Sequence, residues 1–150
     1  MNVRIVVANE RKAEFFDAYR PGTPLNACGT LENPTGGKKD SELETDRPGR
    51  RMGGGQGQPH HHGVDGERST EQHELTLFAK VVGQRIDADR IGHRFDRLVL
   101  VAPPKMLGLI RQALPVQSQS LLASEISKDL LHHGPEAVMN AVPRETFWTV

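Results

Sequence analysis

Two short, almost wholly apolar runs, residues 3–8 and residues 98–102, indicate the fold class of this chain. Runs of this composition are typical of strands that are buried on both faces. The second run is followed by two prolines, which end the strand and favour a helix that begins at Pro104. A further apolar run at residues 121–126 completes an order of strand, helix and strand. This order predicts a right-handed crossover within a mixed α/β sheet flanked by helices.

Three further elements are expected beside this unit. Residues 13–19 contain a pair of phenylalanines, which favours a second strand antiparallel to the first, although a short helix remains open. Apolar residues recur at helical spacing from Met106 to Leu114, where Pro115 ends the helix. A final short helix is predicted over residues 135–141.

A longer helix is predicted between Ser69 and Gly92. Residues 69–72 have the spacing of a capping box, in which a hydroxyl and a glutamine satisfy free N–H groups at the helix start. Gly92 provides a C-terminal stop. The expected apolar stripe consists of Leu75, Phe78, Val82 and Ile86, widened by Val81.

Length and charge limit the possible partners. A chain of 150 residues that is 36% hydrophobic is long enough for one domain, and we predict a single domain over residues 1–150. Basic and acidic residues balance at 19 each, so any attraction to RNA must be local. The first apolar run is too short for a signal segment or a membrane span. Cys28 is the sole cysteine, which excludes an intrachain disulfide, and we predict a cytoplasmic protein with no membrane partner.

The stretch from Arg20 to Arg68 is rich in Gly, Pro, Asn, Asp and Ser and has almost no apolar periodicity. Most of it is therefore predicted to be loop, and residues 21–68 are expected to be flexible. A loop of this length in a compact domain is usually functional or disordered.

This predicted loop contains a glycine run that ends in one amide side chain. Glycines permit positive φ and close approach to the backbone, so Gly54 and Gly55 would present Gln56 to whatever binds. The basic residues just before the run form the one local cluster of note and suit phosphate contacts: Arg47, Arg50 and Arg51.

The chain also resembles a known family. The segments that carry the resemblance are residues 40–43, 46–50, 53–55, 74–79, 95–104, 107–108 and 125–130. Together they resemble the bacterial host attachment family, named as proteins required for attachment to host cells. The resemblance runs from about residue 3 to residue 142 and implies a likeness to the middle domain of archaeal and eukaryotic peptide-chain release factors, an α/β domain of the RNase H-like kind.

The resemblance implies a role for the glycine run. In release factors a Gly-Gly-Gln tip helps water attack the ester that joins the peptide to tRNA, and the glutamine main-chain N–H can stabilise the oxyanion. Gly54, Gly55 and Gln56 would then be catalytic, with the ribosome or RNA as partner. Stop-codon reading is not expected, so the surviving versions are rescue of a stalled ribosome, or plain ribosome or RNA binding. The alternative is a non-enzymatic RNA- or protein-binding module whose role in host attachment is indirect.

Two aspartates are candidates for the edge of such a site. Asp46 lies in the resembling loop and Asp129 follows the last predicted strand, where strand ends in α/β sheets commonly form a ligand crevice. Local capping is the alternative for both.

No cofactor or metal is predicted. His60, His61 and His62 have no standard zinc spacing and are interpreted as solvated loop, as are His132 and His133. Cys28 has no recognisable catalytic partner. The acidic residues of the long helix are expected on its solvated face, and Asp96 and Arg97 as a pair at the strand entry; those helix residues are Glu71, Glu74, Asp87 and Asp89.

Overall fold

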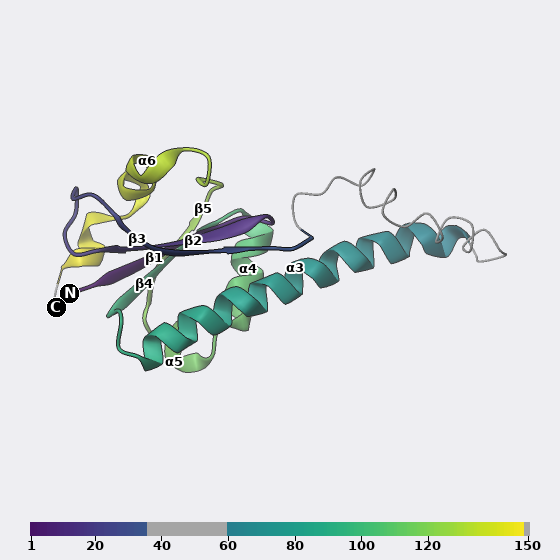
Figure 1. Cartoon of the computed structure of the whole chain (residues 1–150), viewed down its shortest axis with the longest axis horizontal. Helices are drawn as coiled ribbons and strands as arrows, with labels where there is room; N and C mark the ends of the chain where they lie inside the picture. The colour runs from purple at the N-terminus through teal and green to yellow at the C-terminus, as the bar shows by residue number, and fades with distance from the viewer. Residues whose placement is uncertain (36–59, 149–150) are drawn as a thin grey trace.

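The computed structural model describes residues 1–35 and 60–148, with the backbone alone for residues 60–69. Its centre is a five-stranded sheet with the strand order β3-β2-β1-β4-β5 (Figure 1). The strands are β1 (Val3–Ala8), β2 (Lys12–Ala18), β3 (Asn26–Glu32), β4 (Arg97–Ala102) and β5 (Leu122–Ser127). The helices are α3 (His60–Ile91), α4 (Pro104–Ala113), α5 (Val116–Gln119), α6 (Gly134–Ala141) and the 3-10 helix η1 (Arg144–Phe147).

The sheet is mixed, as the sequence predicts. Strand β1 pairs in parallel with β4, and β4 pairs in parallel with β5. On the other side, β2 pairs antiparallel with β1, and β3 pairs antiparallel with β2. The choice between strand and helix for residues 13–19 is thereby settled as an antiparallel strand.

Two hydrophobic clusters cover the two faces of the sheet. On one face, Phe15 and Leu100 of the sheet meet Phe78 and Ile86 of α3 and Ile110 of α4. The other face, with Ile5, Val7, Val99 and Val101, is covered by α6 and the chain around it (Figure 1). Because both faces are covered, β1 and β4 are buried on both sides, which confirms the interpretation of the two apolar runs.

The prediction that residues 21–68 are mostly loop is wrong at both ends of the stretch. Strand β3 occupies Asn26–Glu32, and most of its side chains are exposed. An edge strand with little buried surface lacks the apolar alternation that identifies a strand in sequence. The other end of the stretch is helical from His60 onward.

The start of α3 also differs from the prediction. The helix begins at His60, so residues 69–72 lie inside it and do not form a capping box at its N-terminus. Val81 is 46% exposed and does not widen the buried stripe. The buried face is narrower, and it consists of Phe78, Ala79, Val82 and Ile86 with Leu75 partly buried beside them. The predicted stop is confirmed, because the helix ends at Ile91, next to Gly92.

Candidate functional site

The three parallel strands end at the same edge of the sheet. In the paired register, Val7 of β1 lies beside Val101 of β4, and Ala102 lies beside Ser127 of β5. We call this the carboxyl edge and define it by residues 8–12, 32–35, 102–105 and 127–129. Open α/β sheets usually bind ligands outside the carboxyl ends of their strands, so this edge is the place to look for a site.

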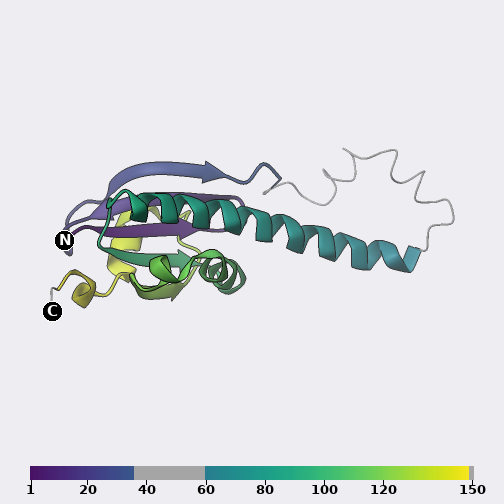
Figure 2. The same ribbon diagram turned by 90° about the horizontal axis from the view of Figure 1, so that it is seen from below.

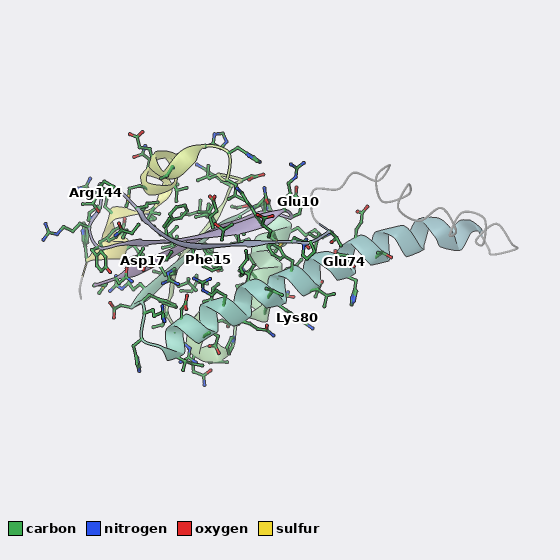
Figure 3. The ribbon with its side chains drawn as sticks, in the orientation of Figure 1. Glu10, Phe15, Asp17, Glu74, Lys80 and Arg144 are labelled. Carbon is green, nitrogen blue, oxygen red and sulfur yellow. The ribbon has the colours of Figure 1, made fainter. Side chains whose placement is uncertain are left out.

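The flank that precedes residues 36–59 lies at this edge and ends at Thr35, whereas α3 begins beyond the edge at His60. Strand β3 runs in the same direction as β1 and ends beside β2, where Glu32 pairs with Lys12. Helix α3 returns from the same end of the molecule, as Figure 1 shows. Thr35 Oγ1 lies 3.3 Å from Glu74 Oε2, which links the end of the β3 segment to α3. Glu10 and Glu74 appear at this end of the ribbon in Figure 3.

Two buried asparagines fix the backbone at the carboxyl edge. Asn9 is 2% exposed, and its Oδ1 accepts hydrogen bonds from the backbone N–H groups of Arg11 and Lys12 at 2.8 and 3.1 Å. Asn33 donates from Nδ2 to the carbonyl of Glu10 at 2.9 Å, and its backbone N–H donates to the carbonyl of Arg11 at 2.8 Å. These bonds tie the β1–β2 turn to the end of β3 and set the direction in which the chain leaves the sheet.

The charged side chains at this edge come from three turns. Lys12 pairs with Glu14 at 3.4 Å, whereas Lys105 and Lys128 are exposed and have no ion pair within residues 1–35 and 60–148. Asp129 is also exposed beside Lys128. The edge can therefore contact a charged ligand through exposed groups, but its described residues enclose no catalytic pair.

The sequence-predicted site residues fall in two groups. Asp129 lies at the carboxyl edge, as predicted from its place after the last strand. The others lie outside the described residues, between Thr35 and His60: Asp46, Arg47, Arg50, Arg51, Gly54, Gly55 and Gln56. Their roles stay predictions.

A buried ion-pair network lies under the C-terminal half of α3, and sequence reasoning missed it. Arg4, 2% exposed on β1, donates hydrogen bonds to the carboxylates of Asp17 on β2 and Asp89 on α3. Arg85 also donates to Asp89, at 3.0 Å, and its guanidinium lies 4.7 Å from the centre of the Phe15 ring. The sequence contained one indication of this network, which is the arginine within an otherwise apolar strand. A buried charge requires a partner of opposite charge.

The network lowers the pKa of Asp89. Burial raises the pKa of Asp89, but hydrogen bonds and charge from Arg4 and Arg85 outweigh burial and hold this pKa below its ordinary value. The expectation that Asp89 lies on a solvated face is therefore wrong, since Asp89 is 7% exposed. Asp87 is half-buried and accepts hydrogen bonds from Arg90 and Ser118. With its charges paired, the network joins β1, β2 and α3 and has no free group for acid or base chemistry.

Cys28 lies on β3 and not in a loop. Its Sγ donates to the carbonyl of Phe15 at 3.3 Å, and Arg85 Nη2 donates to the carbonyl of Cys28 at 2.8 Å. Burial raises the pKa of the Cys28 thiol above its ordinary value, which disfavours the reactive thiolate. The neighbouring Gly29 has φ +142°, and a Cβ there would come within 3.0 Å of Arg85 Nη2. This contact explains a glycine in the middle of the strand.

The described residues also bear on metal binding, on Asp96 and Arg97, and on membrane spans. Within residues 1–35 and 60–148, no group of three or more His, Cys, Asp or Glu side chains is placed to hold a metal ion. The side chains of His60, His61 and His62 are outside that description.

Asp96 and Arg97 were expected to form a pair at the strand entry, but they bind other partners. Asp96 accepts a hydrogen bond from the backbone N–H of Asn2, and Arg97 donates to the carbonyl of Thr146. In the described part of the chain, no helix has the length and apolar character of a membrane span.

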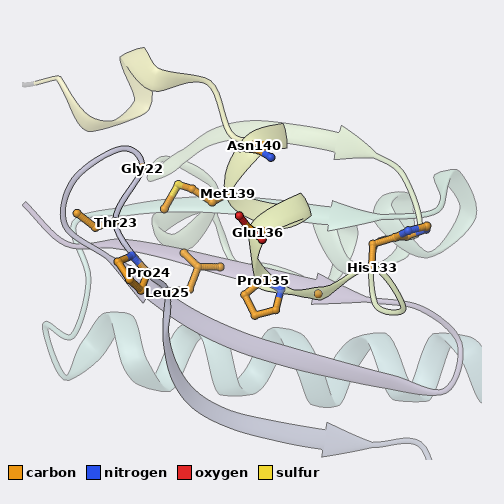
Figure 4. Close-up of a pocket in the computed structure, with 10 residues that line it drawn as sticks. Gly22, Thr23, Pro24, Leu25, His133, Pro135, Glu136, Met139 and Asn140 are labelled. Atoms are coloured by element: carbon orange, nitrogen blue, oxygen red, sulfur yellow. The ribbon is translucent and has the colours of Figure 1, made fainter.

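A cavity of about 600 Å³ lies on the sheet face opposite α3, between the β2–β3 turn and α6 (Figure 4). Leu25 and Met139 line it with apolar atoms, and Thr23, Glu136 and Asn140 add polar groups. The cavity includes none of the residues predicted to carry function.

Comparisons with known proteins agree with the resemblance. A family model described as "Protein required for attachment to host cells" matches residues 4–142. The uncharacterized protein RP470 of Rickettsia prowazekii (strain Madrid E) is 41% identical over 49 residues, which cover 33% of each chain.

Two solved structures are similar over most of this chain. The archaeal translation termination factor aRF1 is 11% identical, with 93% of this chain and 34% of that chain covered and a TM-score of 0.49. A structure described as an archaeal protein is 14% identical, with 97% and 36% covered and a TM-score of 0.48. The chain thus spans about a third of the length of either structure.

Proposed function

The chain belongs to the family of proteins required for attachment to host cells, and from that premise we propose that it is an RNA-binding domain that acts at the ribosome. The observation that carries the proposal is the position of the two described ends of the chain that border residues 36–59. Thr35, before this segment, lies at the carboxyl edge, and α3 begins at His60, beyond the sheet at the same end of the molecule (Figures 1 and 2). In sequence, the arginine cluster lies between these two points.

The length of α3 shows how far the helix extends beyond the sheet. A helix of 32 residues is about 48 Å long, whereas strands of six or seven residues span roughly 20 Å. The sheet therefore cannot cover the whole helix. Leu75 is the first described side chain of α3 that packs against the core, and the helix rises roughly 22 Å between His60 and that position.

The residue types of the segment favour a phosphate-bearing partner. Arg47, Arg50 and Arg51 lie within five positions in sequence, and guanidinium groups form bidentate hydrogen bonds with phosphate. Lys105 and Lys128 would add two exposed cations at the base of the segment. Because the whole chain has zero formal net charge, binding has to come from this local group.

Co-sedimentation with ribosomes at low and moderate salt tests the proposal. We expect the protein to sediment with ribosomes at low salt and to dissociate as salt rises, because phosphate contacts release counterions. The triple variant Arg47→Ala, Arg50→Ala, Arg51→Ala should lose binding by tenfold or more and show a shallower salt dependence. A matched control replaces three exposed arginines at the opposite end of the sheet with alanine. These are Arg20, just after β2, Arg94, whose carbonyl accepts from Asn2, and Arg144 (Figure 3). Equal loss in both triple variants would contradict a binding site in the segment.

A second candidate function is hydrolysis of the peptidyl-tRNA ester. The resemblance to release factors implies a helix that begins almost directly after a Gly-Gly-Gln tip. Helix α3 begins at His60, so three residues separate Gln56 from it, and not the longer spacer expected from a start at Ser69. This earlier start favours Gly54, Gly55 and Gln56 as a tip, with the Gln56 main-chain N–H as an oxyanion donor while water attacks the ester.

Peptide release from stalled ribosomes separates the two functions. If the segment is catalytic, Gln56→Ala and Gly55→Ala should each lower the release rate at least a hundredfold while co-sedimentation stays unchanged, consistent with loss of transition-state stabilisation. If the protein is a binding module alone, wild type and both variants should show no release above background. Detection of the protein at the cell surface would favour a direct role in attachment, and its full recovery in the cytosolic fraction would favour an indirect one.

A further inference from the structure

One face of α3 carries exposed apolar residues at coiled-coil spacing. Leu77, Val81 and Ile91 are 42%, 46% and 61% exposed. With the exposed Gln84 and Ala88 between them, they repeat at alternating intervals of four and three residues. We call these five residues the α3 stripe. This spacing is the pattern by which two helices pack side by side.

The stripe is separate from the face that packs on the sheet. At 100° per residue, it lies almost opposite the buried residues Phe78, Val82 and Ile86. Helix α4 approaches the helix elsewhere, at Gly83, where an added Cβ would meet Ala113 at 3.1 Å. The stripe is therefore left without a partner among the described residues.

The exposed apolar surface continues beside the stripe. Ser118 of α5 donates a hydrogen bond to Asp87 at 2.9 Å, which places α5 along the C-terminal half of α3. Val116 of the same short helix is 76% exposed. Four of the seven exposed large hydrophobic residues of the described chain thus belong to this one side of the molecule. A cluster of this kind marks an interaction surface more often than scattered exposed residues do.

We infer that the chain self-associates through the α3 stripe as an antiparallel pair of helices related by a two-fold axis. A stripe with a regular repeat is complementary to a second copy of itself, as a two-fold interface requires. In the antiparallel arrangement Val81 of one copy lies beside Gln84 of the other, and Leu77 lies beside Ala88. This proposal concerns assembly and does not depend on RNA binding.

Charge beside the stripe selects the antiparallel orientation. Lys80 and Asp87 flank the stripe on the same side, and Lys80 is exposed on the side of α3 away from the sheet (Figure 3). In the antiparallel pair each Lys80 faces the Asp87 of the other copy, whose Oδ1 accepts from Arg90 and Ser118, and this gives two attractive pairs. In a parallel pair the position facing Lys80 is Arg85, whose guanidinium is bound to Asp89 and the Cys28 carbonyl, so Lys80 would gain no attractive partner. A stripe of four turns is shorter than most stable interfaces, so the dimer should dissociate on dilution.

Sedimentation velocity over a concentration series from 1 to 500 μM tests this assembly. We expect a reversible monomer–dimer equilibrium in the wild type. Val81→Asp should raise the dimer dissociation constant at least tenfold, and Trp148→Asp, at an exposed aromatic residue elsewhere, should leave it unchanged. A wild type that stays monomeric throughout the series, or a dimer indifferent to Val81→Asp, would overturn the inference.

Charge reversal tests the orientation. Lys80→Glu should weaken the dimer several-fold, because it faces Asp87 in the antiparallel pair, and adding Asp87→Lys should restore the association. Circular dichroism checks that each variant retains its helix content. A dimer that Lys80→Glu leaves unchanged or strengthens, or that the added Asp87→Lys fails to restore, would overturn the antiparallel assignment.

Discussion

The C-terminal half of α3 packs on the sheet, whereas its N-terminal half extends beyond the strands. From Leu75 to Ile91 the helix lies on the sheet and buries Phe78, Val82 and Ile86. The preceding part extends beyond the strands (Figure 2) and contains two glycines, Gly63 and Gly66, which are poor helix formers. The comparison teaches that packing on the sheet defines the C-terminal half of α3, whereas the N-terminal half extends past the strands.

The largest predicted effect is a difference in the free energy of unfolding between alanine substitutions at two neighbouring residues of α3. Phe78→Ala removes a buried ring and is expected to lower the free energy of unfolding by about 3–5 kcal/mol. Leu77→Ala, one position earlier and exposed, should change it by less than about 0.5 kcal/mol. Denaturant unfolding at low protein concentration measures both. Equal losses would show that α3 is not oriented as described.

The next effect concerns the ion-pair network at the end of the packed half. Asp89→Asn weakens hydrogen bonds to two arginines, Arg4 and Arg85, and should cost about 1.5–3 kcal/mol at neutral pH. Because the pKa of Asp89 is lower in the folded than in the unfolded chain, its contribution is present above about pH 4 and is lost as pH falls further.

Unfolding measured from pH 7 to pH 3 checks this dependence. The difference in stability between wild type and Asp89→Asn should stay constant down to about pH 5 and shrink below about pH 4. A difference that grew on acidification would mean that the pKa of Asp89 is raised by folding.

A smaller effect tests the close contact between α3 and α4. Gly83→Ala places a Cβ 3.1 Å from the Ala113 side chain and carbonyl oxygen, and should destabilise the protein by about 1 kcal/mol. Gly108→Ala, at a helical position with no atom within 4 Å of the added Cβ, should stabilise it by up to about 1 kcal/mol. Thermal unfolding of the two variants should therefore shift in opposite directions. A stabilising Gly83→Ala would show that α3 and α4 can separate without cost.

The sequence predicted the elements whose side chains are packed in the core. Strands β1 and β4 are continuous apolar runs, and the prolines around α4 mark its start and end. Strand β3 could not be found in this way, because it is an edge strand held largely by β2 and by Arg85. The early start of α3 was missed because its first turns lack an apolar stripe.

The candidate site was predictable in part. Asp129 follows a recognisable strand, so its position at the carboxyl edge could be inferred from topology. The network of Arg4 and Asp89 joins residues 85 positions apart, and no local pattern predicts such a pairing. For Asp89 the helical periodicity was misleading, because its side of α3 is not exposed to solvent. Asp89 is buried there and accepts hydrogen bonds from Arg4 and Arg85.

Replacing residues 36–59 with a Gly-Ser sequence of the same length tests most directly whether binding resides outside the packed body. The account predicts an unfolding free energy within about 1 kcal/mol of wild type, because the described core is untouched, together with loss of low-salt co-sedimentation with ribosomes. A replaced chain that sediments with ribosomes as well as the wild type would contradict the account.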